Sequence, residues 1–171
     1  MFTIGTFAQT TWEVGNTTLT EYNLVTGVQL PWEILWGPDD YIWMTSRKGE
    51  VMRVDPETGN YTVVLERSVI SNGNGEPGML GMAMHPDWEN TSKVFVVYCT
   101  GSAWNGDEHL SVFDWDGTAL VNEEILLTIQ AGGIHNGSRL LVLPDNTLLM
   151  TAGDVGSSSL AQLESSLQGK T

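Results

Sequence analysis

The sequence contains one cysteine, few basic residues and no long apolar run. Cys99 has no partner for an internal disulfide, and its position after the apolar run 94–98 predicts a buried strand residue. Seven lysines and arginines stand against 21 aspartates and glutamates, and the net charge of −14 argues against nucleic acid or an anionic membrane as a partner. No segment approaches the ~18 apolar residues that a membrane-spanning helix needs.

Two further patterns are scarce. The first residues lack the basic and small-residue features of a signal peptide, so we expect none in this chain. Helical periodicity is limited to 157–169, where leucines at 160, 163 and 167 follow serines that can supply an N-cap, which predicts one short helix or helical turn. The 19 glycines, 7 tryptophans and 16% charged residues instead suit short strands separated by tight turns. We expect an all-β protein located outside the cytoplasm, periplasmic or secreted.

An internal repeat indicates the architecture. Segments 34–45 and 140–151 align without a gap, and each runs from one apolar stretch through Pro-Asp into another. A looser copy begins at Met82. The three Pro-Asp pairs start at residues 38, 86 and 144, so successive pairs are 48 and 58 residues apart. Proline and aspartate favour tight turns, and a spacing near ~50 residues with strand-like contents is typical of β-propeller blades.

The chain therefore predicts about three blades of a β-propeller. Because propellers close with about four to eight blades, we expect a fragment of a longer protein, with the remainder of the propeller or another chain packing on open blade faces. Residues 1–27 would lead into the propeller and 28–171 would form it. Segments 79–84 and 139–143 should be inner strands buried on both faces. The expected strands lie near 32–37, 41–46, 50–54, 61–65, 79–84, 93–99, 109–115, 124–128, 139–143 and 147–152.

The segment Gly132-Gly-Ile-His-Asn-Gly-Ser-Arg139 places one histidine among glycines, directly before an apolar run. Glycines let a backbone approach a ligand closely, and an imidazole can accept a proton near neutral pH. His135 is therefore a candidate general base. The alternative is an ordinary loop histidine without a chemical role.

Several motifs follow one another in a fixed order from about residue 28 to the end of the chain. They are Pro31-Trp32, Pro38-Asp39, Thr45-Ser-Arg47-Lys-Gly49, Gly75-Glu-Pro-Gly-Met-Leu-Gly-Met-Ala-Met-His-Pro-Asp-Trp88, His135-Asn-Gly-Ser-Arg139, Thr151-Ala-Gly-Asp154 and Gly169-Lys170. In this order the motifs resemble the N-terminal half of the soluble quinoprotein glucose and aldose-sugar dehydrogenases, the glucose/sorbosone dehydrogenase family.

The resemblance implies a six-bladed propeller that binds pyrroloquinoline quinone (PQQ) near calcium on its axial face. It implies oxidation of an aldose or similar sugar, with electrons passed on to an acceptor. His135 would be the general base that takes the proton of the anomeric hydroxyl while hydride passes to the quinone, and Glu76 would lie beside the quinone. Most other ligands of PQQ and calcium would lie beyond residue 171, and we expect no metal site in this chain.

Other residues receive structural interpretations. Arg139 cannot serve as a base and is read as a positioning or structural residue, and His85 as a turn histidine. The carboxylate pairs Asp107–Glu108 and Asp114–Asp116 lack the spacing of a calcium loop and are expected to be solvated.

The sequence departs from the family pattern near the proposed site. Ile134 stands where an Asp or His is common, and Ser138 and Pro77 stand where glycines are expected. These departures leave two alternatives open. One is a non-catalytic propeller that binds protein or glycan on the same scaffold, and the other is a calcium-dependent propeller lactonase. Fold resemblance alone does not decide between them.

Overall fold

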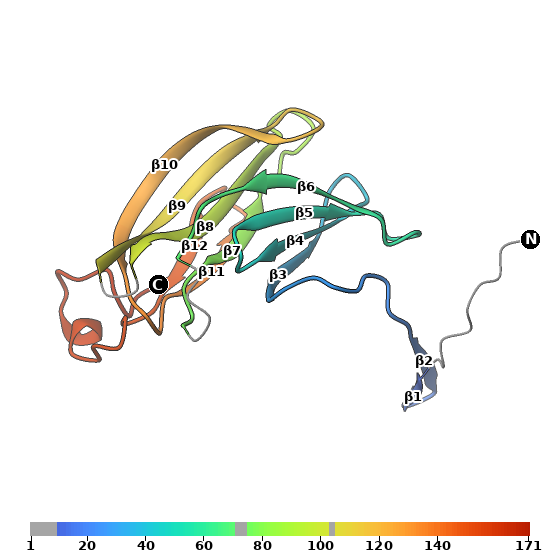
Figure 1. Cartoon of the computed structure of the whole chain (residues 1–171), viewed down its shortest axis with the longest axis horizontal. Coiled ribbons are helices and arrows are strands. Elements are labelled where there is room, and N and C mark those ends of the chain that lie inside the picture. The colour runs from blue at the N-terminus through green and yellow to red at the C-terminus, as the bar shows by residue number, and fades with distance from the viewer. Residues whose placement is uncertain (1–9, 71–74, 103–104) are drawn as a thin grey trace, which may run out of the picture.

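The computed structural model describes residues 10–70, 75–102 and 105–171, and its regular structure is almost entirely antiparallel β-sheet (Figure 1). The strands are β1 (Thr10–Val14), β2 (Thr17–Glu21), β3 (Pro31–Trp36), β4 (Ile42–Ser46), β5 (Glu50–Val54), β6 (Tyr61–Glu66), β7 (Met79–Met84), β8 (Lys93–Ser102), β9 (Asn105–Trp115), β10 (Leu120–Ala131), β11 (Gly137–Val142) and β12 (Leu148–Ala152). All ten expected strands are present, and the all-β prediction is confirmed. The β1–β2 hairpin was not predicted.

The strands form successive blades of a partial β-propeller. Strands β3 to β6 make one four-stranded sheet, β7 to β10 make a second, and β11 with β12 makes a two-stranded third. The turns at Pro38, Pro86 and Pro144 each join the first two strands of one blade, as the repeat predicted. In Figure 1 the three sheets lie side by side, and β7 contacts both β3 and β11. The chain therefore forms an open arc of blades.

The largest apolar core lies between the first two blades. Trp43 is fully buried there, and its ring meets the Trp115 and Trp88 rings edge-on, with centroids 5.0 and 6.1 Å away. Met79 and Phe113 of the second blade are also fully buried in this cluster. A smaller cluster between the second and third blades includes Ala83, Val97, Leu110 and Leu140. Alternate strand residues thus pack neighbouring sheets face to face.

The inner strands show where the arc is open. Strand β7 is buried along most of its length because it has a blade on each side, as predicted. The expectation that 139–143 is buried on both faces is wrong. In β11 Leu140 is buried but Leu141 is 55% exposed, because only one side of this strand faces another described blade. On the opposite open side, β3 exposes Trp32, Ile34 and Trp36.

The segment before the first blade has two described parts. The β1–β2 hairpin is exposed at every residue and stands apart from the sheets in Figure 1. Residues Leu24, Val25 and Val28 then pack against a buried cluster of the first blade that includes Met44 and Met52. Residues 1–9 of the expected lead-in lie outside the described residues.

Three smaller expectations have structural outcomes. The expected helical turn in 157–169 is the 3-10 helix η1 (Leu160–Gln162). Ser159 stands at its N-cap position, but the Ser159 side chain makes no capping hydrogen bond. Cys99 is a buried strand residue, as expected, and burial raises the pKa of its thiol to about 12. Within the described part of the chain, no helix is long and apolar enough to cross a membrane.

Candidate functional site

The candidate site is built around the loop that joins β10 to β11. The Asn136 side chain is 2% exposed and bonds back across this loop to Gly132. Its amide oxygen accepts the Gly132 N–H at 2.8 Å, and its amide nitrogen donates to the Gly132 carbonyl at 3.0 Å. Because an asparagine amide is both donor and acceptor, one side chain closes the loop from within. His135 is held inside this closed loop.

The backbone of His135 is fixed from two sides. It has φ of +56°, and its N–H donates to the Glu76 carboxylate at 2.6 Å. Its carbonyl accepts the Val155 N–H at 3.1 Å. A Cβ atom on Gly153 would lie 1.7 Å from that carbonyl oxygen, so only glycine fits at this crossing. The β6–β7 loop and the segment after β12 therefore determine where the histidine stands.

The His135 ring is paired with Asp154. The Nδ1 and Oδ1 atoms are 2.9 Å apart, and this contact is the main cause that lowers the pKa of the Asp154 carboxyl. Because a carboxylate only accepts, Nδ1 carries the hydrogen, and in the neutral ring Nε2 is then free to accept a proton. The His135 side chain is 55% exposed, so a small ligand can reach it. A histidine held in this way can act as a general base.

Asp154 was not singled out in the sequence, although its motif was. The β11–β12 hairpin pairs Gly137 with Ala152. Continuing that antiparallel pairing by two residues on each strand brings positions 135 and 154 opposite each other. The hairpin around Pro144 therefore contained a signal for this pair.

Glu76 and His135 are brought together although 59 residues separate them in sequence. The Glu76 N–H also donates to the Gly133 carbonyl at 3.1 Å. Sequence reasoning missed Arg47, whose guanidinium donates to the carbonyls of Gly75 and Pro77, on either side of Glu76. Arg47, in the β4–β5 turn, thus holds the loop around Glu76, and Glu76 in turn holds the backbone of His135. The assignment of Glu76 to the quinone stays a prediction.

Arg139 follows the loop and forms an ion pair with Glu33 of β3, at 3.1 Å. Glu33 is 3% exposed, and burial is the main cause that raises the pKa of its carboxyl. The Arg139 N–H donates to the Thr151 hydroxyl at 2.9 Å, and a cleft is lined by Trp32, Gly137, Arg139 and Thr151. These contacts agree with a positioning or structural residue. No pattern in the sequence indicated Glu33 as its partner.

A family model described as glucose/sorbosone dehydrogenase matches residues 28–171. The chain belongs to the glucose/sorbosone dehydrogenase family. It is 28% identical over 151 residues to quinoprotein glucose dehydrogenase B of Acinetobacter calcoaceticus, covering 82% of this chain and 32% of that protein. It is 30% identical over 145 residues to an uncharacterised protein of Synechocystis, covering 78% of this chain and 35% of that one.

A solved structure of a sugar dehydrogenase has a fold similar to that of this chain. The PQQ-bound aldose sugar dehydrogenase of Streptomyces coelicolor superposes with a TM-score of 0.76 at 29% identity, covering 86% of this chain and 45% of that one. The chain spans about a third of the length of the curated relatives and less than half of this structure. The blades described here are therefore part of the fold that this family member has.

The acidic residues that the structure describes do not gather as metal ligands. No group of three histidine, cysteine or acidic side chains that could hold a metal ion occurs in residues 10–70, 75–102 and 105–171. Asp114 pairs with Lys93 at 2.6 Å, and Asp116 accepts backbone N–H bonds within its own turn. The expectation that Glu108 is solvated is wrong, because the side-chain alternation of β9 turns it inward, where it is 1% exposed.

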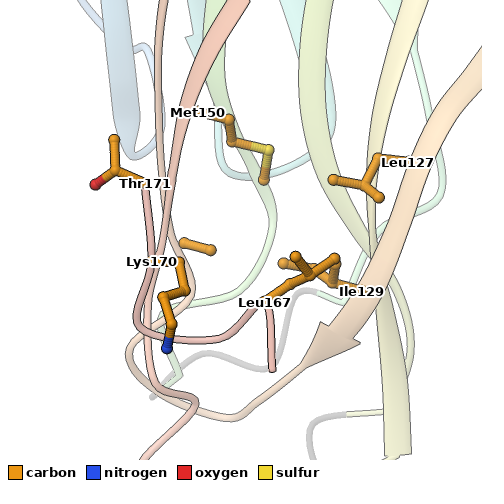
Figure 2. A pocket seen from close by; sticks show the side chains of 7 residues that line it. Leu127, Ile129, Met150, Leu167, Lys170 and Thr171 are labelled. Atoms are coloured by element: carbon orange, nitrogen blue, oxygen red, sulfur yellow. The ribbon is translucent and has the colours of Figure 1, made fainter. Parts of the chain in front are cut away.

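A second hollow is lined by none of the residues around His135. Its lining is mostly apolar and comes from β10, β12 and the C-terminal segment (Figure 2). Lys170 borders it, but the Lys170 ammonium donates to the carbonyls of Leu160 and Ala161, at 3.2 and 2.8 Å. This hollow offers no group for proton transfer. Its lining residues are Leu127, Ile129, Met150, Ala152, Leu167, Lys170 and Thr171.

Proposed function

We propose that the protein carrying this chain is a PQQ-dependent sugar dehydrogenase in which His135 accepts the hydroxyl proton of an aldose. The observation that carries the proposal is the 2.9 Å contact between His135 Nδ1 and Asp154. It fixes the tautomer that leaves Nε2 as the base, on a ring that is half exposed. Membership of the family and the likeness to a PQQ-bound sugar dehydrogenase support the choice of cofactor and substrate class.

The other residues of the site would act by holding the base. Asp154 keeps the ring oriented and stabilises its protonated form, and Glu76 anchors the His135 backbone through the 2.6 Å bond. Glu76 and the exposed His135 ring would lie beside the quinone. PQQ, when bound, supplies the acceptor for the hydride of the substrate. As the family resemblance implies, most of the residues that hold PQQ and calcium would lie beyond residue 171.

The division of the chain and its location belong to the same proposal. Residues 28–171 would be the propeller portion, and 1–27 would lead into it. Leu24 and Val25 support this reading, because they pack against a buried cluster of the first blade but belong to none of its strands. An aldose oxidised by such an enzyme would be met outside the cytoplasm, and the electrons would pass to a separate acceptor.

The test is reconstitution of the full-length protein with PQQ and calcium, followed by reduction of an artificial electron acceptor in the presence of aldoses. His135→Ala should lower turnover by roughly 10²–10⁴-fold, the usual contribution of a general base. His85→Ala is the matched control. His85 accepts the Asp87 N–H within its own turn at 3.2 Å, so its loss should leave turnover close to that of the unmodified protein.

Two results would contradict the proposal. Unchanged turnover in His135→Ala would remove this residue from the reaction. A full-length protein that binds no PQQ would instead favour the non-catalytic propeller, for which the exposed Trp32 and Ile134 near the loop would be contact residues.

A further inference from the structure

Ser138 has an unusual conformation for its residue type. Its φ is +82°, in the left-handed region that favours glycine, and its side chain is fully buried. A residue with a Cβ atom is disfavoured in this region unless the surrounding contacts hold it there. Ser138 also stands where the family motif carries glycine. Some interaction of the serine must therefore compensate for the conformation it adopts.

That interaction is a buried hydrogen bond to the second blade. The Ser138 hydroxyl donates to Glu108 Oε1 at 2.8 Å, and Glu108 is 1% exposed. Glu108 lies within the second blade, paired with Cys99 of β8 and with Ile129 of β10. The bond thus connects an interior strand of one blade to the first strand of the next. Hydrogen bonds in such dry surroundings are strong and costly to leave unmade.

A movement of Ser138 would also move the loop that carries His135, three residues earlier in the chain. His135, Gly137 and Ser138 all have positive φ, so three of four consecutive residues have left-handed backbone. A Cβ atom on Gly81 of β7 would lie 1.7 Å from the Ser138 carbonyl oxygen, which shows how closely this backbone packs on the neighbouring blade. A shift at Ser138 therefore has little room and must be taken up by the loop that carries His135.

We propose that Glu108 and Ser138 are positioning residues, whose buried hydrogen bond holds the start of β11 in its left-handed conformation and thereby fixes the His135 loop. The inference rests on the proposed role of His135 as the base. Glu108 Oε2 has no hydrogen-bond partner among the described residues, so Ser138 is the contact that orients this carboxyl. Neither residue touches the substrate in this scheme.

Two substitutions at one position separate the hydrogen bond from the backbone conformation. Ser138→Ala keeps the Cβ atom in the left-handed region but removes the hydroxyl, whereas Ser138→Gly removes the hydroxyl and makes that conformation easy. In the full-length, PQQ-loaded protein, Ser138→Ala should lower kcat by about 10- to 100-fold, the scale expected when a catalytic group is misplaced by about 1 Å. KM for the aldose should change less than twofold. Ser138→Gly should keep most of kcat.

A second measurement does not depend on activity. The His135 N–H is bonded to Glu76, so its hydrogen exchange reports on the loop directly. Hydrogen exchange at this amide should be about tenfold faster in Ser138→Ala than in the unmodified protein, and nearly unchanged in Ser138→Gly. The Gly49 N–H, bonded to Ser46 at 2.9 Å in the first blade, is the internal control. Ser111→Ala, at a fully buried serine of β9, is the matched variant and should leave the His135 amide unaffected.

The outcomes distinguish this inference from the proposed function. If the unmodified protein oxidises no aldose, the proposed function fails, and the exchange experiment alone decides the positioning role. If it is active while Ser138→Ala keeps both its kcat and its His135 exchange rate, the positioning role is wrong. Equal loss of kcat in Ser138→Gly and Ser138→Ala would overturn the argument from the left-handed backbone.

Discussion

Replacing Glu108 with glutamine should change the way in which the stability of the protein depends on pH. Burial is the main cause that raises the pKa of the Glu108 carboxyl from 4.5 to about 7, and the Ser138 hydrogen bond opposes it in part. The folded state therefore holds this proton more tightly than the unfolded chain does. The stability that Glu108 contributes is fully present below pH 4.5 and is lost as the pH rises through about 7.

The magnitude follows from the two pKa values. They differ by about 2.5, and each pKa unit corresponds to about 1.4 kcal/mol, so roughly 3 kcal/mol is lost between the two limits. Glutamine has the same shape and can still accept the Ser138 hydroxyl bond, but it does not titrate. The free energy of unfolding of Glu108→Gln, minus that of the unmodified protein, should therefore rise by about 3 kcal/mol from pH 4 to pH 8.

The assay is urea unfolding of both proteins at pH 4, 6 and 8, with tryptophan fluorescence as the measure of the folded fraction. Taking the difference between the two proteins at each pH cancels the titration of all other groups that the substitution leaves alone. The steepest change should fall between pH 5 and 7. A difference that stays constant across the range would refute the argument that burial raises the pKa of Glu108. A difference that falls as the pH rises would mean that folding lowers this pKa.

Three further predictions concern the site and the core. Asp154→Asn should lower turnover by up to about 10²-fold, because an amide can donate to Nδ1 and favour the wrong tautomer; steady-state rates equal to those of the unmodified protein would contradict this. Gly153→Ala should destabilise the fold by about 1–3 kcal/mol, because its Cβ atom would meet the His135 carbonyl oxygen, and an unchanged urea midpoint would count against that crowding. Trp43→Ala should cost about 3–5 kcal/mol in the free energy of unfolding, since the whole side chain is buried between two blades, whereas a loss below about 1 kcal/mol would show that this core is not continuous.

The amino-acid sequence by itself determined the strands and their grouping into blades. Strand alternation and Pro-Asp turns act over a few residues, so the turns at Pro38, Pro86 and Pro144 could be recognised without any distant contact. The β1–β2 hairpin was missed, although Gly15-Asn16 between two short runs is a hairpin signal. Its strands carry few apolar residues, and no core depends on them.

The tertiary structure decided which side chains from distant segments meet. His135 was recognisable from its glycine-rich surroundings, and its contact with Asp154 follows the register of the β11–β12 hairpin. Its contact with Glu76 depends on how the loop before β7 is placed against the loop before β11. Glu108 shows the limit most clearly, because an acidic pair in the sequence is usually solvated. The alternation of β9 directs this carboxyl inward, but only the neighbouring blade, which brings Ser138 to it, decides that the inward side is buried.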